Sequence, residues 1–200
     1  MKGLTFDEAT HTYRFNGNVV PGVTSILSPL TDFSMVRPDV LDAASKFGQA
    51  VHLACELDDL GTLDESALDA SLVPYLEGWR KFSKDYLVEW SSIEVQVYHA
   101  NMNYAGTPDR IGLVKGDNTV VDIKSTAALY PSVGPQLSAY AHASGNKFAK
   151  RLAVQLKSNG TYVAEYYKDP TDWPVFVSLL TVRNWCARNS IAPKFNGATK

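Results

Sequence analysis

The chain has 200 residues, of which 45% are hydrophobic and 20% charged, and this composition predicts one folded domain with a full apolar core. No apolar stretch approaches the roughly 18 residues of a membrane span, and the first residues lack the apolar segment of a secretory signal. The net charge is −2, which excludes an evenly basic nucleic-acid-binding domain, but residues 1–100 carry −8 and residues 101–200 carry +6.

The first part of the sequence predicts a hairpin followed by helices. Residues 12–20 alternate weakly between polar and apolar side chains around an Asn-Gly pair, which is typical of a short β-hairpin. Residues 38–60 have a helical pattern, with proline in the first turn and glycine directly after the last residue. A second helical region is expected over residues 65–88, and Pro74 is expected to kink or divide it.

From residue 93 the apolar period changes from that of a helix to that of strands. Ile93, Val95 and Val97 alternate with their neighbours, which predicts a half-buried strand over residues 93–98. Further strands are expected over 109–114, 119–124, 151–156 and 162–167, a turn over 116–118, and helices over 134–144 and 170–188. This order of elements predicts an α/β fold in which a central mixed β-sheet is flanked by helices.

Two carboxylates and one amine stand in otherwise apolar strands. Asp109 and Asp122 are 13 residues apart, on adjacent predicted strands joined by a tight turn, and Lys124 shares the strand face of Asp122. Burying these charges costs free energy unless they are paired or bind a metal, and two converging carboxylates would repel each other. The pattern therefore predicts either a site for a divalent cation such as Mg²⁺ or a plain Asp–Lys ion pair.

Three motifs in this order resemble the core of the PD-(D/E)XK nuclease superfamily. They are Gly-Thr-Pro-Asp at 106–109, Asp-Ile-Lys-Ser at 122–125 and Gln-x-x-x-Tyr at 136–140. Within the superfamily, the sequence most resembles the RecB-type branch, which includes phage-encoded exonucleases. The resemblance implies a restriction-endonuclease-like core and a metal-dependent deoxyribonuclease that uses Mg²⁺ or Mn²⁺.

The resemblance also implies roles for individual residues. Gly48 and His52 match the G-x-x-x-H context of the metal-binding histidine in this branch. The implied metal ligands are the side chains of His52, Asp109 and Asp122 and the carbonyl oxygen of Ile123. The implied catalytic residues are Asp109, Asp122, Lys124, Glu94, Gln136 and Tyr140.

Two hydroxyl residues, Ser125 and Thr126, directly follow the strand that carries Asp122. Placed there, they would donate hydrogen bonds to a substrate phosphate, and we assign them to substrate binding. Capping of the turn after the strand is an equally good interpretation of the same residues.

We expect one nuclease domain over residues 1–200. Its parts would be an N-terminal hairpin and loop over 1–37, a helical segment over 38–90 and a catalytic sheet core over 91–190. The implied activity is that of a phage-type exonuclease in recombination or DNA-end processing. A structure-specific endonuclease of the same superfamily and a non-catalytic protein that binds DNA or a partner remain the alternatives.

The expected partners and location follow from the same resemblance and from the cysteines. DNA is the implied partner, together with a single-strand-annealing or single-strand-binding recombination protein, while a homo-oligomer is left open and no membrane is expected. Cys55 and Cys186 are too few for a disulfide framework, a four-cysteine zinc site or an iron–sulfur cluster. A reducing cytoplasmic setting is expected, which is the host cytoplasm if the protein is phage-encoded.

Overall fold

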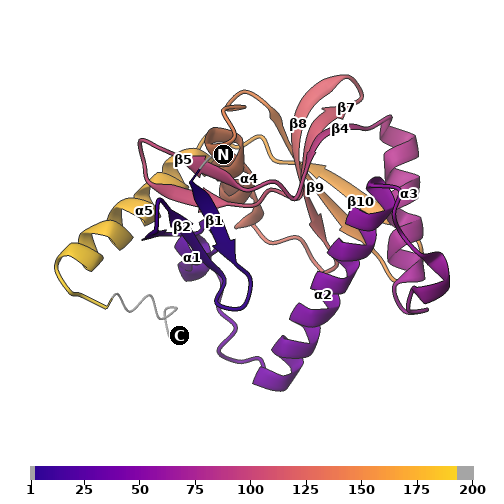
Figure 1. The fold of residues 1–200 in the computed structure, drawn as a ribbon, viewed down its shortest axis with the longest axis horizontal. Coiled ribbons are helices and arrows are strands. Elements are labelled where there is room, and N and C mark those ends of the chain that lie inside the picture. Colours follow the sequence, from indigo (N-terminus) through magenta and orange to yellow (C-terminus); the bar gives the residue numbers. More distant parts are fainter. Residues whose placement is uncertain (1–2, 193–200) are drawn as a thin grey trace.

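Five strands form one mixed sheet in the computed structural model, which describes residues 3–192 (Figure 1). The order across the sheet is β10-β9-β8-β7-β4. β8 and β9 run parallel, and the other neighbouring pairs are antiparallel. The strands are β4 Glu89–Ile93, β7 Arg110–Val114, β8 Asp117–Lys124, β9 Lys150–Leu156 and β10 Tyr162–Tyr166.

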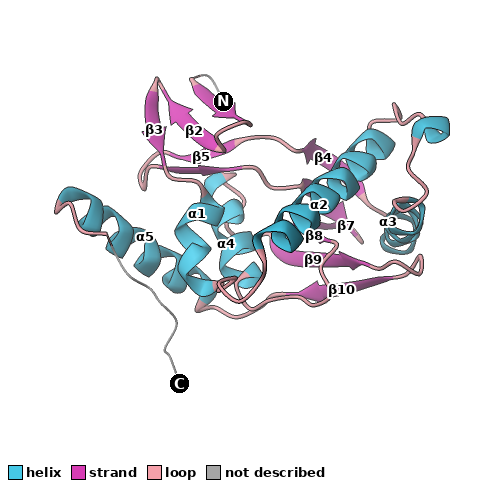
Figure 2. Ribbon diagram, turned by 90° about the horizontal axis from the view of Figure 1, so that it is seen from below, coloured by secondary structure: helices cyan, strands magenta, loops and turns pink. Residues whose placement is uncertain are grey.

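Helices cover both faces of this sheet, as Figures 1 and 2 show. β8 contributes to both apolar cores, because successive side chains of a strand point to opposite faces. Val120 packs in one core, and Val121 and Ile123 pack in the other. The predicted α/β class, with a central mixed sheet flanked by helices, is confirmed. The helices are α1 Val23–Leu27, α4 Val133–Ala143 and α5 Asp172–Arg188 on one face, and α2 Pro38–Asp59 and α3 Val73–Tyr86 on the other.

The N-terminal residues form a separate three-stranded sheet. The predicted hairpin over 12–20 is confirmed, and Asn16 and Gly17 have positive φ angles of 48° and 83°, as a two-residue hairpin turn requires. The sequence pattern did not predict the first strand of this sheet or the short strand pair that packs against it. The strands of the three-stranded sheet are β1 Leu4–Asp7, β2 Thr12–Phe15 and β3 Asn18–Val20. The strands of the pair are β5 Val97–His99 and β6 Tyr104–Gly106.

The helical segment agrees with the sequence in its first half and differs in its second. α2 occupies the predicted span to within one residue, and Gly61, two residues beyond its end, has a φ of 67°. The region over 65–88 contains a short 3₁₀ helix, Glu65–Ala67, and then α3. Pro74 lies in the first turn of α3, where its missing N–H removes no hydrogen bond, so it starts a helix rather than kinking a longer one. A further 3₁₀ turn, Ser28–Leu30, follows α1.

The single strand predicted over residues 93–98 is wrong. β4 ends at Ile93, and β5 begins only at Val97 and belongs to a different sheet. The chain turns at Glu94, whose φ is 48° and whose N–H donates to the Asp109 carbonyl at 3.0 Å. A residue in the left-handed region cannot continue an extended strand. The strand therefore ends before Glu94, although the alternation of apolar residues continues beyond it.

The later elements lie where the sequence pattern placed them, with small shifts at their ends. The turn between β7 and β8 is made by Lys115 and Gly116, with φ angles of 52° and 79°, so β8 begins at Asp117 rather than at Thr119. α4, β9, β10 and α5 correspond to the four predicted elements that follow. Among residues 3–192, no helix combines the length and apolar character that crossing a membrane requires.

Gly112 allows β7 to pair closely with β4. A Cβ atom added there would overlap the Glu89 carbonyl and lie 2.8 Å from Trp90 Cα. We expect Gly112→Ala to lower the free energy of unfolding by about 1–3 kcal/mol, because backbone atoms cannot move aside as a flexible side chain can. Urea denaturation measures this change.

Gly48→Ala is the matched control for that measurement. Its added methyl would lie 3.5 Å from Ser125 Oγ, an ordinary contact, and alanine favours the helix. We expect Gly48→Ala to leave the unfolding free energy unchanged or to raise it. Equal stability of the Gly112→Ala variant and the unmodified protein would contradict the close pairing.

Candidate metal centre and active site

The buried side chain of Asp109 is bound to the backbone of β8. Its Oδ2 accepts a hydrogen bond from the Ile123 N–H at 2.6 Å. β7 and β8 are antiparallel neighbours with Arg110 opposite Val121, which brings Asp109 next to the part of β8 that carries Asp122. This contact involves the amide of Ile123, and the role of its carbonyl as a ligand stays a prediction.

His52 reaches Asp109 from α2. Its Nδ1 lies 3.5 Å from Asp109 Oδ1. Burial opposes a charged imidazole, but the Asp109 carboxylate outweighs burial and raises the pKa of His52 to about 9. Burial likewise opposes ionisation of Asp109, yet the positive charge of His52 lowers the pKa of that carboxyl below its usual value. A cation that binds here must therefore displace the imidazole proton.

Glu94 completes a cluster with His52 and Asp109. One potential ligand atom of each of these three residues lies within 4.8 Å of the other two. Glu94 has a φ that a non-glycine residue rarely adopts, and such strain is frequent at functional sites. Burial and the charge of Asp109 raise the pKa of Glu94 to about 8. The sequence assigned Glu94 a catalytic role, and the structure places it among the candidate metal ligands.

Asp122 lies beside this trio in a second polar cluster, on the face of the sheet that α4 covers. Lys124 Nζ lies 2.7 Å from Asp122 Oδ2. Gln136 Nε2, on α4, donates to Asp122 Oδ1 at 2.9 Å and to Tyr140 OH at 3.3 Å. Lys124 Nζ donates to Gln136 Oε1 at 3.4 Å. The four predicted residues are thus one hydrogen-bonded unit.

The charge states of this second cluster follow from its surroundings. Burial raises the pKa of Asp122 to about 6, although the charge of Lys124 opposes the rise. Burial disfavours the ammonium form of Lys124, but Asp122 and Asp109 outweigh it and raise the lysine pKa. Burial also raises the pKa of Tyr140 well above its usual value. At neutral pH, Lys124 is therefore a cation that can stabilise negative charge, and Tyr140 is a neutral phenol.

Ser125 and Thr126 lie where the sequence placed them, directly after β8. Thr126 Oγ1 donates to the Ala128 carbonyl at 2.8 Å, which is the turn-capping arrangement, and the Thr126 carbonyl accepts a bond from Gln155 Nε2 at 2.7 Å. Ser125 Oγ faces α2 near Gly48. The geometry therefore favours turn capping for Thr126, while contact of either hydroxyl with a phosphate stays a prediction.

The sequence did not predict several residues that lie around the site. Gln155 on β9 lies opposite Lys124 in the parallel register and holds the loop after β8. Tyr13, from the N-terminal sheet, bonds through its hydroxyl to Thr107 Oγ1 at 2.8 Å, so this sheet borders the site. A Cβ at Gly106 would lie 2.6 Å from the ring of Tyr140, which explains the glycine in the Gly-Thr-Pro-Asp motif.

The donor set of the trio fits a small divalent cation. It offers two carboxylates and one imidazole, and Mg²⁺ and Mn²⁺ prefer oxygen ligands, with imidazole tolerated by the transition metal. Burial and the negative charge of Asp109 both disfavour the ionised form of Glu94, and added positive charge would offset both. A divalent cation would supply that charge.

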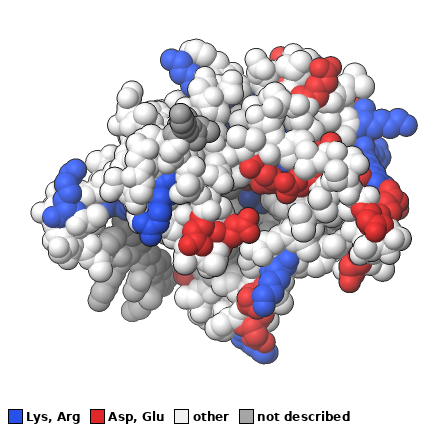
Figure 3. All heavy atoms as spheres, in the orientation of Figure 1, with Lys and Arg blue, Asp and Glu red and all other residues white. Residues whose placement is uncertain are grey.

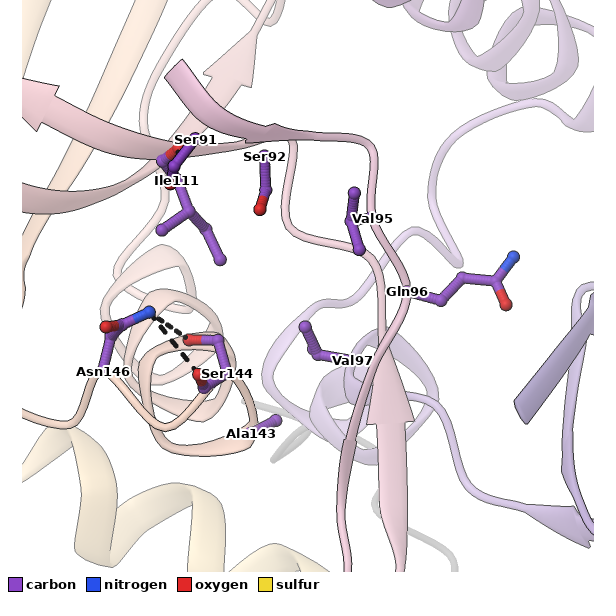
Figure 4. Close-up of a pocket in the computed structure, with 9 residues that line it drawn as sticks. All are labelled: Ser91, Ser92, Val95, Gln96, Val97, Ile111, Ala143, Ser144 and Asn146. Atoms are coloured by element: carbon purple, nitrogen blue, oxygen red, sulfur yellow. Dashed lines mark hydrogen bonds between the residues drawn. The ribbon is translucent and has the colours of Figure 1, made fainter. Parts of the chain in front are cut away.

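One cavity in the described part of the chain lies apart from these residues. It has a volume of about 260 Å³ and lies between β4, β5 and the C-terminal end of α4 (Figure 4). Its wall is made of serine, asparagine, glutamine and small apolar side chains, and no charged residue lines it. It offers no group suited to acid–base or metal chemistry.

The surface in Figure 3 has an uneven charge distribution. Acidic side chains gather near the middle of this face, and Lys and Arg side chains are scattered towards its edges. Among the described residues visible there, no continuous basic stripe is formed.

Comparison with known proteins gives distant structural likenesses. No model of a known protein family matches the chain, and no curated protein matches it. The crystal structure of SSO0001 has a TM-score of 0.43 and 16% identity, over 88% of this chain and 78% of that chain. LHK-Exo in complex with dAMP has a TM-score of 0.41 and 16% identity, over 86% of this chain and 93% of that chain. A second structure, of the alkaline exonuclease LHK-Exo from Laribacter hongkongensis, has a TM-score of 0.41 and 13% identity, over 84% and 92% of the two chains.

Proposed function

We propose that this protein is a metal-dependent deoxyribonuclease that hydrolyses DNA phosphodiester bonds. The observation that carries the proposal is the meeting of two clusters at one site: the trio His52, Glu94 and Asp109, and the unit that joins Asp122 to Lys124. Neither cluster alone requires a nuclease. Together they provide cation ligands and a half-buried amine beside them.

The trio is proposed to hold Mg²⁺ or Mn²⁺, with Asp122 and the Ile123 carbonyl as further ligands. When bound, such a cation supplies positive charge to a phosphodiester and lowers the pKa of a water molecule. Lys124, a cation held by Asp122 and Gln136, is proposed to stabilise the charge that develops on the phosphate, and these two contacts support that role. Gln136, which is hydrogen-bonded to both groups, keeps the Lys124 amine beside the Asp122 carboxylate.

Within this activity, we propose an exonuclease of the phage type, acting in recombination or DNA-end processing in the cytoplasm. This finer assignment rests on the resemblance of the three sequence motifs to phage-encoded members of the superfamily. DNA is the proposed substrate, with a single-strand-annealing or single-strand-binding protein as partner and a homo-oligomer as an arrangement to be tested by sedimentation.

Cation dependence is the direct test of the proposal. We expect Mg²⁺ or Mn²⁺ to support degradation of linear duplex DNA, excess chelator to abolish it, and added cation to restore it. Ca²⁺, which is larger and accepts looser geometry, should permit DNA binding with little cleavage. Gel analysis of end-labelled DNA measures the cleavage under each of these conditions.

The control is the Asp109→Asn variant, which removes one carboxylate of the trio. It should show no cleavage in any of these cations. Full cleavage by the unmodified protein in excess chelator would contradict the proposed metal chemistry.

A further inference from the structure

Arg110 is a fully buried cation next to the candidate metal centre. Its side chain has 0% exposure. It follows Asp109 directly and points to the opposite face of the sheet, towards α2 and α3, where its guanidinium lies 5.5 Å from the ring of Trp79. Since a buried guanidinium is costly unless it is paired, its partners indicate what it does.

The guanidinium joins three groups that come from different parts of the chain. Arg110 Nε lies 2.7 Å from Asp59 Oδ2, at the end of α2. Nη1 donates to Glu94 Oε1 at 3.2 Å and to the backbone carbonyl of Asp109 at 2.6 Å. Two of the three candidate metal ligands are therefore tied to one side chain.

Asp59, the partner of Arg110 at the end of α2, is itself held by a second hydrogen bond. Its Oδ1 accepts a hydrogen bond from Trp79 Nε1 at 3.1 Å, and Trp79 is fully buried and stacked on Trp90. A carboxylate held at both oxygens cannot rotate. The guanidinium bound to it is accordingly fixed in position as well.

Glu94, the partner of Arg110 at the candidate metal centre, lies outside the helices and strands. It follows the end of β4 in the left-handed backbone region, and its side chain is 25% exposed. No strand pairing or helix restrains such a carboxylate. Its bond to Arg110 uses Oε1, so Oε2 is the oxygen that we assign to a cation.

We propose that Arg110 is a positioning residue that holds Glu94 towards His52 and Asp109, with Asp59 as its anchor. This inference rests on the proposed function, because it assigns Glu94 to the metal centre. Arg110 makes no contact with the cation or the DNA in this scheme. It acts through Glu94 and through the backbone of Asp109.

Isothermal titration with Mn²⁺ in the absence of DNA tests the inference. Arg110→Lys keeps the charge but lacks the planar fork that joins Asp59 to Glu94. We expect Arg110→Lys to weaken Mn²⁺ binding about 10- to 100-fold, the usual effect of losing a residue that orients a ligand. Glu94→Gln should also weaken binding, and the double variant should bind no more weakly than Glu94→Gln alone.

A stability control separates positioning from folding. Phe82→Leu perturbs the same core but touches none of the ligands, so it should lower the melting temperature and leave the Mn²⁺ affinity unchanged. Unchanged Mn²⁺ affinity in Arg110→Lys, or full additivity in the double variant, would overturn the inference and leave the nuclease proposal intact. Mn²⁺ binding that follows the expected pattern without DNA cleavage would support the inference and contradict the nuclease. An unmodified protein that binds no Mn²⁺ would overturn both.

Discussion

Replacing Lys124 by alanine is expected to lower the single-turnover rate of DNA cleavage by roughly 10²–10⁴-fold, the usual scale for an electrostatic or acid–base group. The amine lies 2.7 Å from Asp122 Oδ2, beside the candidate metal centre, and the nearby carboxylates keep it charged. Its contribution belongs to the transition state, where negative charge grows on the phosphate. Quenched-flow measurement in Mg²⁺ with enzyme in excess over DNA gives this rate.

The same variant should bind DNA almost normally. One cation among several phosphate contacts is a small share of the affinity, so equilibrium binding in Ca²⁺ should change far less than the cleavage rate. Lys84→Ala is the charge-matched control, because Lys84 is exposed on α3 and should affect cleavage little. Near-normal cleavage by Lys124→Ala would reduce this lysine to an ion-pair partner of Asp122 and would contradict the nuclease proposal.

Replacing Arg110 by methionine is expected to lower the free energy of unfolding by about 3–5 kcal/mol, the usual result of removing one partner of a buried ion pair. The variant leaves Asp59, whose side chain is 9% exposed, without its cation. Changing both members should be far less damaging, so Asp59→Asn combined with Arg110→Met should recover most of the loss. Urea denaturation at neutral pH measures both variants and the unmodified protein.

This loss should depend on pH. Burial already raises the pKa of Asp59 even though Arg110 opposes the rise, and removing Arg110 must raise it further. An acid whose folded-state pKa is raised destabilises the fold fully above that pKa, and the destabilisation declines as the pH falls towards the pKa of the unfolded state. The stability difference between Arg110→Met and the unmodified protein should therefore shrink from neutral pH to about pH 5. The pKa of Glu94, which also loses Arg110 as a partner, shifts in the same direction. A difference independent of pH would contradict the buried, unpaired carboxylate.

The sequence was most informative where long apolar strands carry isolated charges. The apolar run around Asp122 predicted β8, and the two-residue spacing to Lys124 predicted the shared face that the ion pair shows. These inferences depend only on the alternation of side chains along a strand. His52, by contrast, came from the family resemblance, because a single histidine on an amphipathic helix carries no local signal of a partner elsewhere.

Other parts of the site could not be predicted from the local pattern. Glu94 sits in a sequence that alternates like a strand, and only the tertiary hydrogen bond to the Asp109 carbonyl explains its turn. β5 and β6 have three residues each, too few for a period to be detected. The pairing of Arg110 with Asp59 joins residues 51 positions apart, and no local rule connects them.

The decisive measurement of the proposed activity compares DNA degradation by the unmodified protein and by Asp109→Asn. The substrates are linear and covalently closed circular duplexes of the same sequence. With Mg²⁺ present, we predict that the unmodified protein releases nucleotides from the linear duplex and leaves the closed circle intact. Asp109→Asn should act on neither. Cleavage of the closed circle would replace the exonuclease by an endonuclease, and no cleavage of either substrate in Mg²⁺ or Mn²⁺ would contradict the proposed enzyme.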